Sequence, residues 1–246
     1  MSGVHPVIAV TCLAFEADIA AGPGVSVICG NALNLADVLQ AAIKSDCAGI
    51  ISFGVAGGLD PKLQAGDVVV ATGVVTENNR RPTHIGWSQN LLRALPGASY
   101  ADIAGVVTPV ATAQAKRELH EKTNTAAVDM ESHIAAEVAA AHDLPFAACR
   151  VIIDPAERDL PPAALIDLGP KGNADLPAIA ASLARRPGQL PSLIKVAADA
   201  WFARTALLRV RHSLGTHLGF TFPAQPIDTP WRRRFYRRSL SGALSA

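Results

Sequence analysis

The 246-residue sequence has few of the residues that mark metal, redox or aromatic-rich binding proteins. Aromatic residues make up 5% of the chain, and there are two methionines and four cysteines. The cysteines have neither zinc-site spacing nor a CxxC pair, and each lies among apolar residues, so we expect reduced, buried thiols. The seven histidines are scattered too. We therefore predict no metal site and no cofactor.

Long hydrophobic runs are also missing. No apolar stretch reaches the roughly 18 residues of a membrane-spanning helix. The N-terminus lacks the basic and then apolar pattern of a signal peptide. We therefore expect a cytoplasmic protein. Hydrophobic residues still make up 50% of the chain, which is enough for the core of one α/β domain.

Charge is distributed unevenly along the chain. From residue 201 to the end there are eight arginines and one acidic residue, which leaves 14 basic and 20 acidic residues before it. We divide the chain into a domain over residues 1–219 and a basic, Pro- and Arg-rich tail over residues 220–246. Arginines interleaved with aromatic residues suit an anionic membrane surface, which would place the protein peripherally at the inner membrane. For residues 195–211 the alternative to membrane binding is a last helix that packs on the sheet and leaves its arginines in solvent. Nucleic acid could also attract the arginines, but nothing else in the chain supports it as a partner.

Short apolar runs alternate with segments of helical spacing. This alternation indicates an α/β fold whose sheet is covered by helices on both faces. Strands are expected at Val7–Leu13, Val25–Cys29, Gly49–Phe53, Val68–Val75, Ile103–Val107, Ala126–Asp129 and Phe146–Ile153. Helices are expected at Leu35–Lys44, Ser88–Leu95, Ala111–Thr123, Glu131–His142, Ile179–Arg185 and Lys195–Arg211.

Three strand ends carry groups suited to chemistry. Glu16 follows the first strand, a glycine turn over residues 54–58 follows the third, and Asp154 follows the last apolar strand. Ligands bind at the carboxyl ends of strands in α/β sheets, and two carboxylates delivered there suit acid–base catalysis. Taken singly, a carboxylate after a strand is more often a helix cap or surface group, and two glycines are more often a plain turn.

Four segments together resemble the bacterial methylthioadenosine/S-adenosylhomocysteine nucleosidases of the nucleoside phosphorylase/nucleosidase superfamily. They are Phe53–Leu59, Gly66–Val70, Ala127–Ser132 and Arg150–Asp154, and the similarity spans roughly residues 7–154. The segments Leu13–Ala17, Asp154–Ala156 and Leu160–Pro162, with the basic C-terminus, resemble the hopanoid-associated phosphorylases more closely. That group is thought to remove adenine from an adenosyl-hopane lipid. The resemblance implies a three-layer αβα fold with a central mixed sheet and a homodimer.

The resemblance also assigns roles to individual residues. Asp154 matches the acid that protonates the purine ring nitrogen, and Glu16 matches the base that activates the attacking water. Glu131 matches the carboxylate that holds the ribose hydroxyls, with Met130 packed beside the sugar. The backbone of Ala56 and Gly57 is expected to line sugar and base. The substrate would be a small or lipid-linked nucleoside.

Three positions depart from the family pattern or resist alignment. Val55 stands where the family usually has serine, so a polar contact near the nucleophile is missing. Ile153 stands where a serine often precedes the acid, which removes a group that would position Asp154. The segment that contacts the base aligns only loosely, with residues 110–112.

Water is favoured over phosphate as the attacking group, because Glu16 lies where phosphorylases of this fold place an arginine. Ser52 and Val55 replace a further arginine and a serine. Phosphorolysis, with inorganic phosphate as co-substrate, remains an alternative, as do a soluble methylthioadenosine-type nucleosidase and an inactive nucleoside sensor. Candidates for a phosphate site from elsewhere are Arg80, Arg81 and Arg150.

Overall fold

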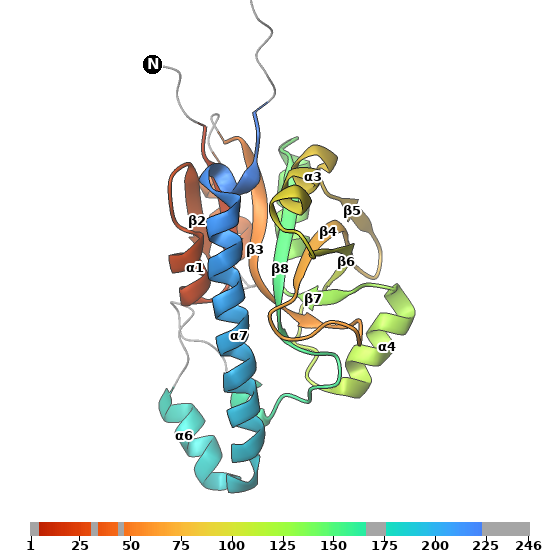
Figure 1. The fold of residues 1–246 in the computed structure, drawn as a ribbon, viewed down its shortest axis with the longest axis vertical. Helices are drawn as coiled ribbons and strands as arrows, with labels where there is room; N and C mark the ends of the chain where they lie inside the picture. The colour runs from red at the N-terminus through yellow and green to blue at the C-terminus, as the bar shows by residue number, and fades with distance from the viewer. Residues whose placement is uncertain (1–4, 31–33, 44–46, 166–175, 223–246) are drawn as a thin grey trace, which may run out of the picture.

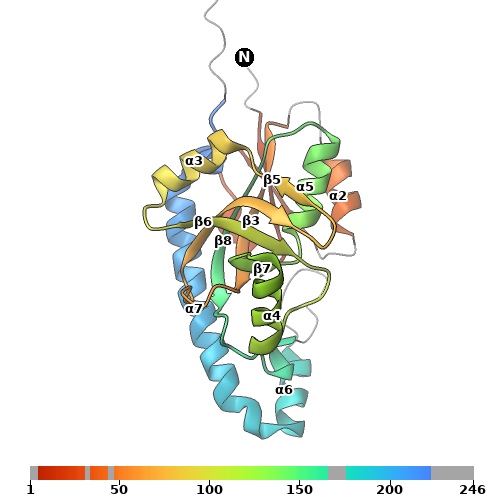
Figure 2. The same ribbon diagram turned by 90° about the vertical axis from the view of Figure 1, so that its right-hand side faces the viewer.

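A mixed β-sheet forms the centre of the fold, and helices cover both of its faces (Figures 1 and 2). The computed structural model describes residues 5–30, 34–43, 47–165 and 176–222. The strands are β1 (Val7–Thr11), β2 (Val25–Cys29), β3 (Gly49–Gly58), β4 (Val68–Val75), β5 (Arg80–Pro82), β6 (Ser99–Gly105), β7 (Ala127–Asp129) and β8 (Phe146–Asp154). The helices are α1 (Ala14–Ala20), α2 (Leu35–Ala42), α3 (Ile85–Ala94), α4 (Ala113–Thr123), α5 (Ser132–Ala141), α6 (Leu176–Arg185) and α7 (Leu190–Leu214). The predicted α/β fold with a central mixed sheet is confirmed.

Two apolar clusters hold the layers together. On one face of the sheet, α2 and α5 pack through residues such as Leu35, Leu39 and Ala135. On the other face, α1, α3 and α7 pack through residues such as Trp87 and Leu207. Strands β1 and β8 are buried along nearly their whole length, as expected for strands covered on both faces, and this explains their unbroken apolar sequences.

The central strand β3 changes partner along one of its edges. Residues Gly49 to Ser52 pair with β1, whereas Gly57 and Gly58 pair with the antiparallel β7. Strand β8 runs along the opposite edge over nearly the whole length of β3. Residues 53–56 of β3 therefore have no strand partner on the edge shared by β1 and β7. This gap lies beside the carboxyl end of β1, where ligand sites of α/β sheets form.

The strands beyond the gap close into a ring. Strand β8 pairs with β4 as well as β3, β4 pairs with β6, β6 pairs with β7, and β7 pairs back with β3. A mixed sheet that closes in this way brings the ends of β7 and β8 together beside the carboxyl end of β3, where both Val128 and Asp154 pair with Gly57. The ring was not expected from the sequence, because strand order is not visible in periodicity.

Several predicted elements are displaced. The strand predicted over Val7–Leu13 ends at Thr11, because the chain turns into α1, which was not predicted. The polar segment from Glu77 to Trp87 contains β5, an edge strand that was also missed. The last helix is longer than predicted at both ends. The burial prediction for the cysteines holds fully for Cys149 alone: Cys12 and Cys47 are half-buried, and Cys29 is exposed as the last residue of the edge strand β2.

Helix α7 crosses one face of the molecule and extends beyond the sheet towards α6 (Figure 1). It packs through Ala203, Ala206, Leu207 and Val210 and leaves Trp201 62% exposed. Phe220 packs against Trp87, with ring centroids 4.8 Å apart. The predicted tail lies outside the described residues from position 223 onward. Among the described residues, no helix combines the length and apolarity that a membrane crossing requires.

Candidate active site

A cavity of about 200 Å³ opens where β3 changes partner, and its wall contains every residue predicted to act in the site. Those residues are Glu16, Ala56, Gly57, Met130, Glu131 and Asp154. They come from α1, β3, the turn between β7 and α5, and the end of β8. The remaining wall is mainly apolar and includes Leu13, Val106, Pro109, Val110 and Leu160. The structure thus brings together groups that are far apart in the sequence, while their roles stay predictions.

Glu16 lies in the first turn of α1 and is 1% exposed. Its Oε2 accepts hydrogen bonds from the backbone N–H groups of Cys12 (2.9 Å) and Leu13 (2.8 Å). Its Oε1 accepts one from the N–H of Val55 at 2.6 Å. A carboxylate offers about four lone-pair positions, so one remains for a water molecule. Burial raises the pKa of Glu16, and the nearby Arg150 opposes that shift.

The unpaired edge of β3 is satisfied by side chains of the site. The Val55 N–H donates to Glu16, and the Val55 carbonyl accepts from Arg150 Nη1 at 3.3 Å. Gly54 allows this approach, because a Cβ there would lie 2.3 Å from Glu16 Oε1. Side-chain charges therefore replace the ladder hydrogen bonds that a neighbouring strand would supply. The backbone contact of Val55 does not need the serine that the family usually has there.

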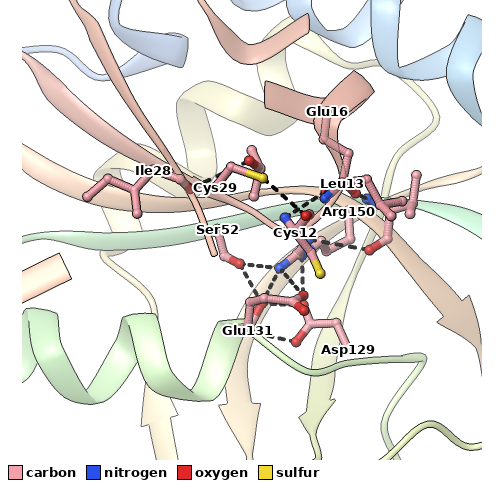
Figure 3. Close-up of polar contacts among 12 residues, drawn as sticks. Cys12, Leu13, Glu16, Ile28, Cys29, Ser52, Asp129, Glu131 and Arg150 are labelled. Atoms are coloured by element: carbon pink, nitrogen blue, oxygen red, sulfur yellow. Dashed lines mark hydrogen bonds and ion pairs between the residues drawn. The ribbon is translucent and has the colours of Figure 1, made fainter. Parts of the chain in front are cut away.

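Arg150 lies beneath the cavity and is fully buried (Figure 3). Its guanidinium forms ion pairs with Asp129 at 2.7 Å and Glu131 at 3.3 Å, and it also donates to Ser52. Asp129 in turn accepts from the Ser132 N–H at the start of α5. A fully charged guanidinium is stable here because several acceptors surround it.

Glu131 is a buried carboxylate that lies close to Arg150, Asp129 and Glu16. Burial raises the pKa of Glu131 to about 7, while Arg150 acts in the opposite direction. The Cys12 thiol also donates to Glu131, and burial raises the pKa of that thiol, which keeps it protonated. Glu131 thus changes charge near neutral pH.

Asp154 ends β8 and is 7% exposed. Its Oδ2 forms an ion pair with the fully buried Lys116 of α4. Burial raises the pKa of Asp154, and the charge of Lys116 opposes the rise. Gly57 lies next to the carboxylate, since a Cβ on Gly57 would be 3.4 Å from both of its oxygens.

Among the described residues that form the wall of the cavity, none is cationic. Arg80 pairs with Asp102 and Arg81 pairs with Glu137, both away from the cavity. Arg150 is covered by the carboxylates that it pairs with. Four carboxylates line the cavity instead, namely Glu16, Asp129, Glu131 and Asp154.

Sequence reasoning missed several polar residues around the site. Lys116 was read only as part of a polar helix, although it shares an inward face with Leu119 and Thr123, where an apolar residue is the usual choice. Asp129 and Ser132 stood beside the recognised Met130 and Glu131, but their link to Arg150 depends on the fold. Of the loosely assigned segment 110–112, only Val110 lines the cavity, and Thr112 caps α4.

Comparisons with known proteins establish the family and the fold. The family model described as "Phosphorylase superfamily" matches residues 19–105 and 103–184. A 5′-methylthioadenosine/S-adenosylhomocysteine nucleosidase from Helicobacter pylori has a similar structure, with a TM-score of 0.61 and 14% identity, over 85% of this chain and 97% of that one. The corresponding nucleosidase from Colwellia psychrerythraea, solved with adenine, has a TM-score of 0.59 and 14% identity, over 85% and 96%.

A third similar structure is the futalosine hydrolase of Helicobacter pylori. Its TM-score is 0.55 and its identity 15%, over 80% of this chain and 98% of that one. A search of curated proteins found no match. At this identity the solved structures establish the fold. The family match covers well over half of the chain, so the superfamily predicted from the four sequence segments is confirmed.

Proposed function

Because the chain belongs to the phosphorylase superfamily, we propose that it is an enzyme that cleaves the N-glycosidic bond of an adenosyl compound by attack of water. The observation that carries this proposal is the pair of carboxylates in one cavity. Glu16 comes from α1 and Asp154 from the end of β8, and both line the same space. The similar structures named for methylthioadenosine and S-adenosylhomocysteine support adenine as the departing base.

The two carboxylates have different environments, which suits different roles. Asp154, protonated at the start, donates its proton to the ring nitrogen of the purine. The bond between the base and the ribose C1′ then breaks, and its electron pair leaves with neutral adenine. The ribose becomes oxocarbenium-like, and water attacks C1′ while Glu16 accepts a proton from that water. Adenine and the free ribosyl compound are the products.

Glu131 and Met130 are proposed to hold the ribose during this reaction. Ionised Glu131 accepts hydrogen bonds from the sugar hydroxyls, and Arg150 keeps its carboxylate in place at 3.3 Å. The apolar wall formed by residues such as Val128 and Val110 suits the flat faces of the base.

Water rather than phosphate is favoured by the charge of the cavity. Phosphate binding needs an accessible arginine or a group of converging backbone N–H groups. Here the described part of the wall contributes four carboxylates and no cation, and the N–H group of Val55 on β3 is already bonded to Glu16. Phosphorolysis is therefore the second candidate, and its support is the family description alone.

One assay separates these candidates. Purified protein is incubated with 5′-methylthioadenosine, S-adenosylhomocysteine and further 5′-substituted adenosines, with and without inorganic phosphate, and the sugar product is identified. We expect free adenine and a free ribose sugar, at a rate that phosphate does not increase. A ribose-1-phosphate product contradicts hydrolysis, and the absence of base release from every compound contradicts the proposed activity.

We also propose that the substrate is a lipid-linked nucleoside, such as an adenosyl-hopane. To reach such a substrate, the protein would bind an anionic membrane surface. The outward face of α7 supports this, because its exposed Ile194, Trp201 and Leu208 lie at helical spacing with Arg204 and Arg209 at their sides. The cavity also holds a nucleoside more readily than a large 5′ group, which would have to extend outside it. A soluble methylthioadenosine-type nucleosidase is the alternative.

Removing residues 224–246 and measuring liposome binding tests the membrane proposal. Full-length protein is expected to bind anionic liposomes at low salt and to dissociate as salt rises, because headgroup attraction is screened. The shortened protein should bind less but cleave a water-soluble adenosyl compound at the same rate. If the full-length protein does not bind anionic liposomes at low salt, the membrane proposal is contradicted.

A further inference from the structure

The sequence places Ile153 before Asp154, where the family often has a serine, so the chain itself supplies no polar neighbour to orient the acid. The structure supplies a cation from another element. Lys116, on the inward face of α4, is fully buried and forms an ion pair with Asp154 Oδ2. The two residues are 38 positions apart. Burying the charge of a lysine among backbone carbonyls carries a large desolvation cost, so the presence of a lysine at this position calls for an explanation.

The ammonium group of Lys116 has its three hydrogens committed. Besides Asp154 Oδ2, Nζ donates to the carbonyl oxygens of Pro155 at 2.9 Å and Arg158 at 3.1 Å, and that of Asp154 lies within reach at 3.5 Å. The three donors of the ammonium group therefore face four acceptors, and none of the donors is left unsatisfied. Lys116 is not part of the cavity wall, so it does not contact a bound nucleoside. Within the described part of the chain, Asp154 Oδ1 accepts no hydrogen bond, which leaves this oxygen for the substrate.

We propose that Lys116 is the positioning residue of the acid: it holds Oδ2 and the turn after β8, so that Oδ1 of Asp154 faces the purine ring. This inference rests on the proposed function, because it assigns Asp154 the role of general acid. Lys116 thereby takes the place of the missing serine, and unlike a serine it carries a charge. The charge has a consequence that a serine would not have, since a nearby cation favours the ionised carboxylate.

The other charged groups near Asp154 are one ion pair in the turn after β8 and, across the cavity, three carboxylates that share one arginine. Arg158 follows in the turn after β8, and Asp199 faces it from α7. These two form an ion pair at 2.8 Å with each other. Across the cavity lie Glu16, Asp129 and Glu131, of which the last two pair with Arg150. Lys116 is thus the cation in direct contact with the acid, and its removal should let Asp154 keep its proton at higher pH.

The test compares Lys116→Met with Lys116→Arg. Methionine keeps the length of the side chain but loses the charge, whereas arginine keeps the charge and changes the geometry. Lys122→Met is the matched control, because Lys122 lies on the same helix but is exposed and pairs with the exposed Glu77. Adenine release is followed from pH 5 to 10 for the wild type and all three variants. Circular dichroism and thermal melting establish that each protein is folded.

For Lys116→Met we expect kcat to fall by about 10²-fold, as for a misplaced catalytic group, with KM changed far less. The high-pH limb of kcat should move to higher pH. Lys116→Arg should lower kcat but keep the limb near its wild-type position, and Lys122→Met should match the wild type. Should Lys116→Met fail to fold, Lys116→Arg decides the matter: unchanged kcat overturns the positioning role.

The outcomes separate this inference from the proposed function. If the wild type releases no adenine, the proposed function is wrong. If the wild type is active and folded Lys116→Met keeps both its kcat and its high-pH limb, the positioning role is wrong. If Lys116→Met loses kcat but its high-pH limb stays at the wild-type position, the proposal is also overturned, because the loss would then be due to packing alone.

Discussion

Replacing Gly54 by alanine tests the contact between the unpaired edge of β3 and Glu16, the proposed general base. A Cβ at this position would lie 2.3 Å from Glu16 Oε1, 2.6 Å from Glu16 Cδ and 2.9 Å from Arg150 Nη1. Real side chains do not approach so closely, so Glu16 must move. Arg150 cannot yield easily, because Asp129 and Glu131 hold its guanidinium. The carboxylate of Glu16 is therefore the group displaced.

The effect has two sources: an alanine is strained at the φ of +156° that Gly54 adopts, and Glu16 loses its interactions. Its 2.6 Å hydrogen bond from the Val55 N–H is charge-assisted, and such bonds stabilise a fold by about 1.5–3 kcal/mol. A base moved away from the attacking water loses a contribution that is typically about 10²–10⁴ in rate. We expect Gly54→Ala to lower the free energy of unfolding by about 1.5–3 kcal/mol. We expect it to lower kcat by at least about 10²-fold.

Urea denaturation and the adenine-release assay measure the two effects separately. Gly188→Ala is the matched control, because a Cβ at Gly188 meets nothing within 4 Å. It should change neither stability nor rate. If Gly54→Ala folds with wild-type stability and retains wild-type kcat, then Glu16 is not fixed by the open edge of β3, and its role as the base loses its structural support.

Further predictions concern the other groups around the cavity. Asp154→Asn should reduce adenine release by about 10²–10⁴, and it should also lower the melting temperature, because it leaves the buried Lys116 without its counter-charge; near-normal turnover would remove Asp154 from the mechanism. The raised pKa of Glu131, about 7, means that activity should fall as pH drops through neutrality, because a protonated carboxyl no longer accepts both sugar hydroxyls. Glu131→Gln should be less active and should lack this acid limb; an unchanged limb would assign it to another group. Arg150→Met leaves buried carboxylates without their cation and should destabilise the fold by about 3–5 kcal/mol in urea denaturation, whereas a neutral result would show that the carboxylates protonate at little cost.

Much of the fold was predictable because its strands are apolar runs of distinctive length. Strand β8 and strand β4 were located almost to their ends, since burial on both faces leaves a continuous hydrophobic signal. Helix α1 was not, because Leu13, Ala14 and Phe15 read as a continuation of β1. What ends β1 is the side chain of Glu16, which bonds the backbone N–H groups of residues 12 and 13. A local sequence pattern cannot reveal that such a bond will form.

The catalytic candidates were accessible from the sequence for a different reason. Glu16, Glu131 and Asp154 each stand at an element boundary, where a resemblance between short motifs can be recognised. Lys116 gave no such signal, since a lysine on a polar helix is ordinary. Only the packing of α4 against the ring reveals that this lysine points inward. The sequence did show that a positioning group was missing beside Asp154, but it did not show which distant residue takes its place.

The ring of strands also has a consequence for how the protein folds. Gly57 pairs with Val128, and Ile50 pairs with Phe146, so closure joins segments roughly 70 to 100 positions apart along the chain. Contacts of such long range are slow to form, because the chain loses loop entropy before they become favourable. The pocket between Glu16, Glu131 and Asp154 does not exist until the last of these pairings is made. During synthesis, the N-terminal half with β1 and β3 leaves the ribosome first and must wait for β7 and β8, with the open edge of β3 exposed in the meantime.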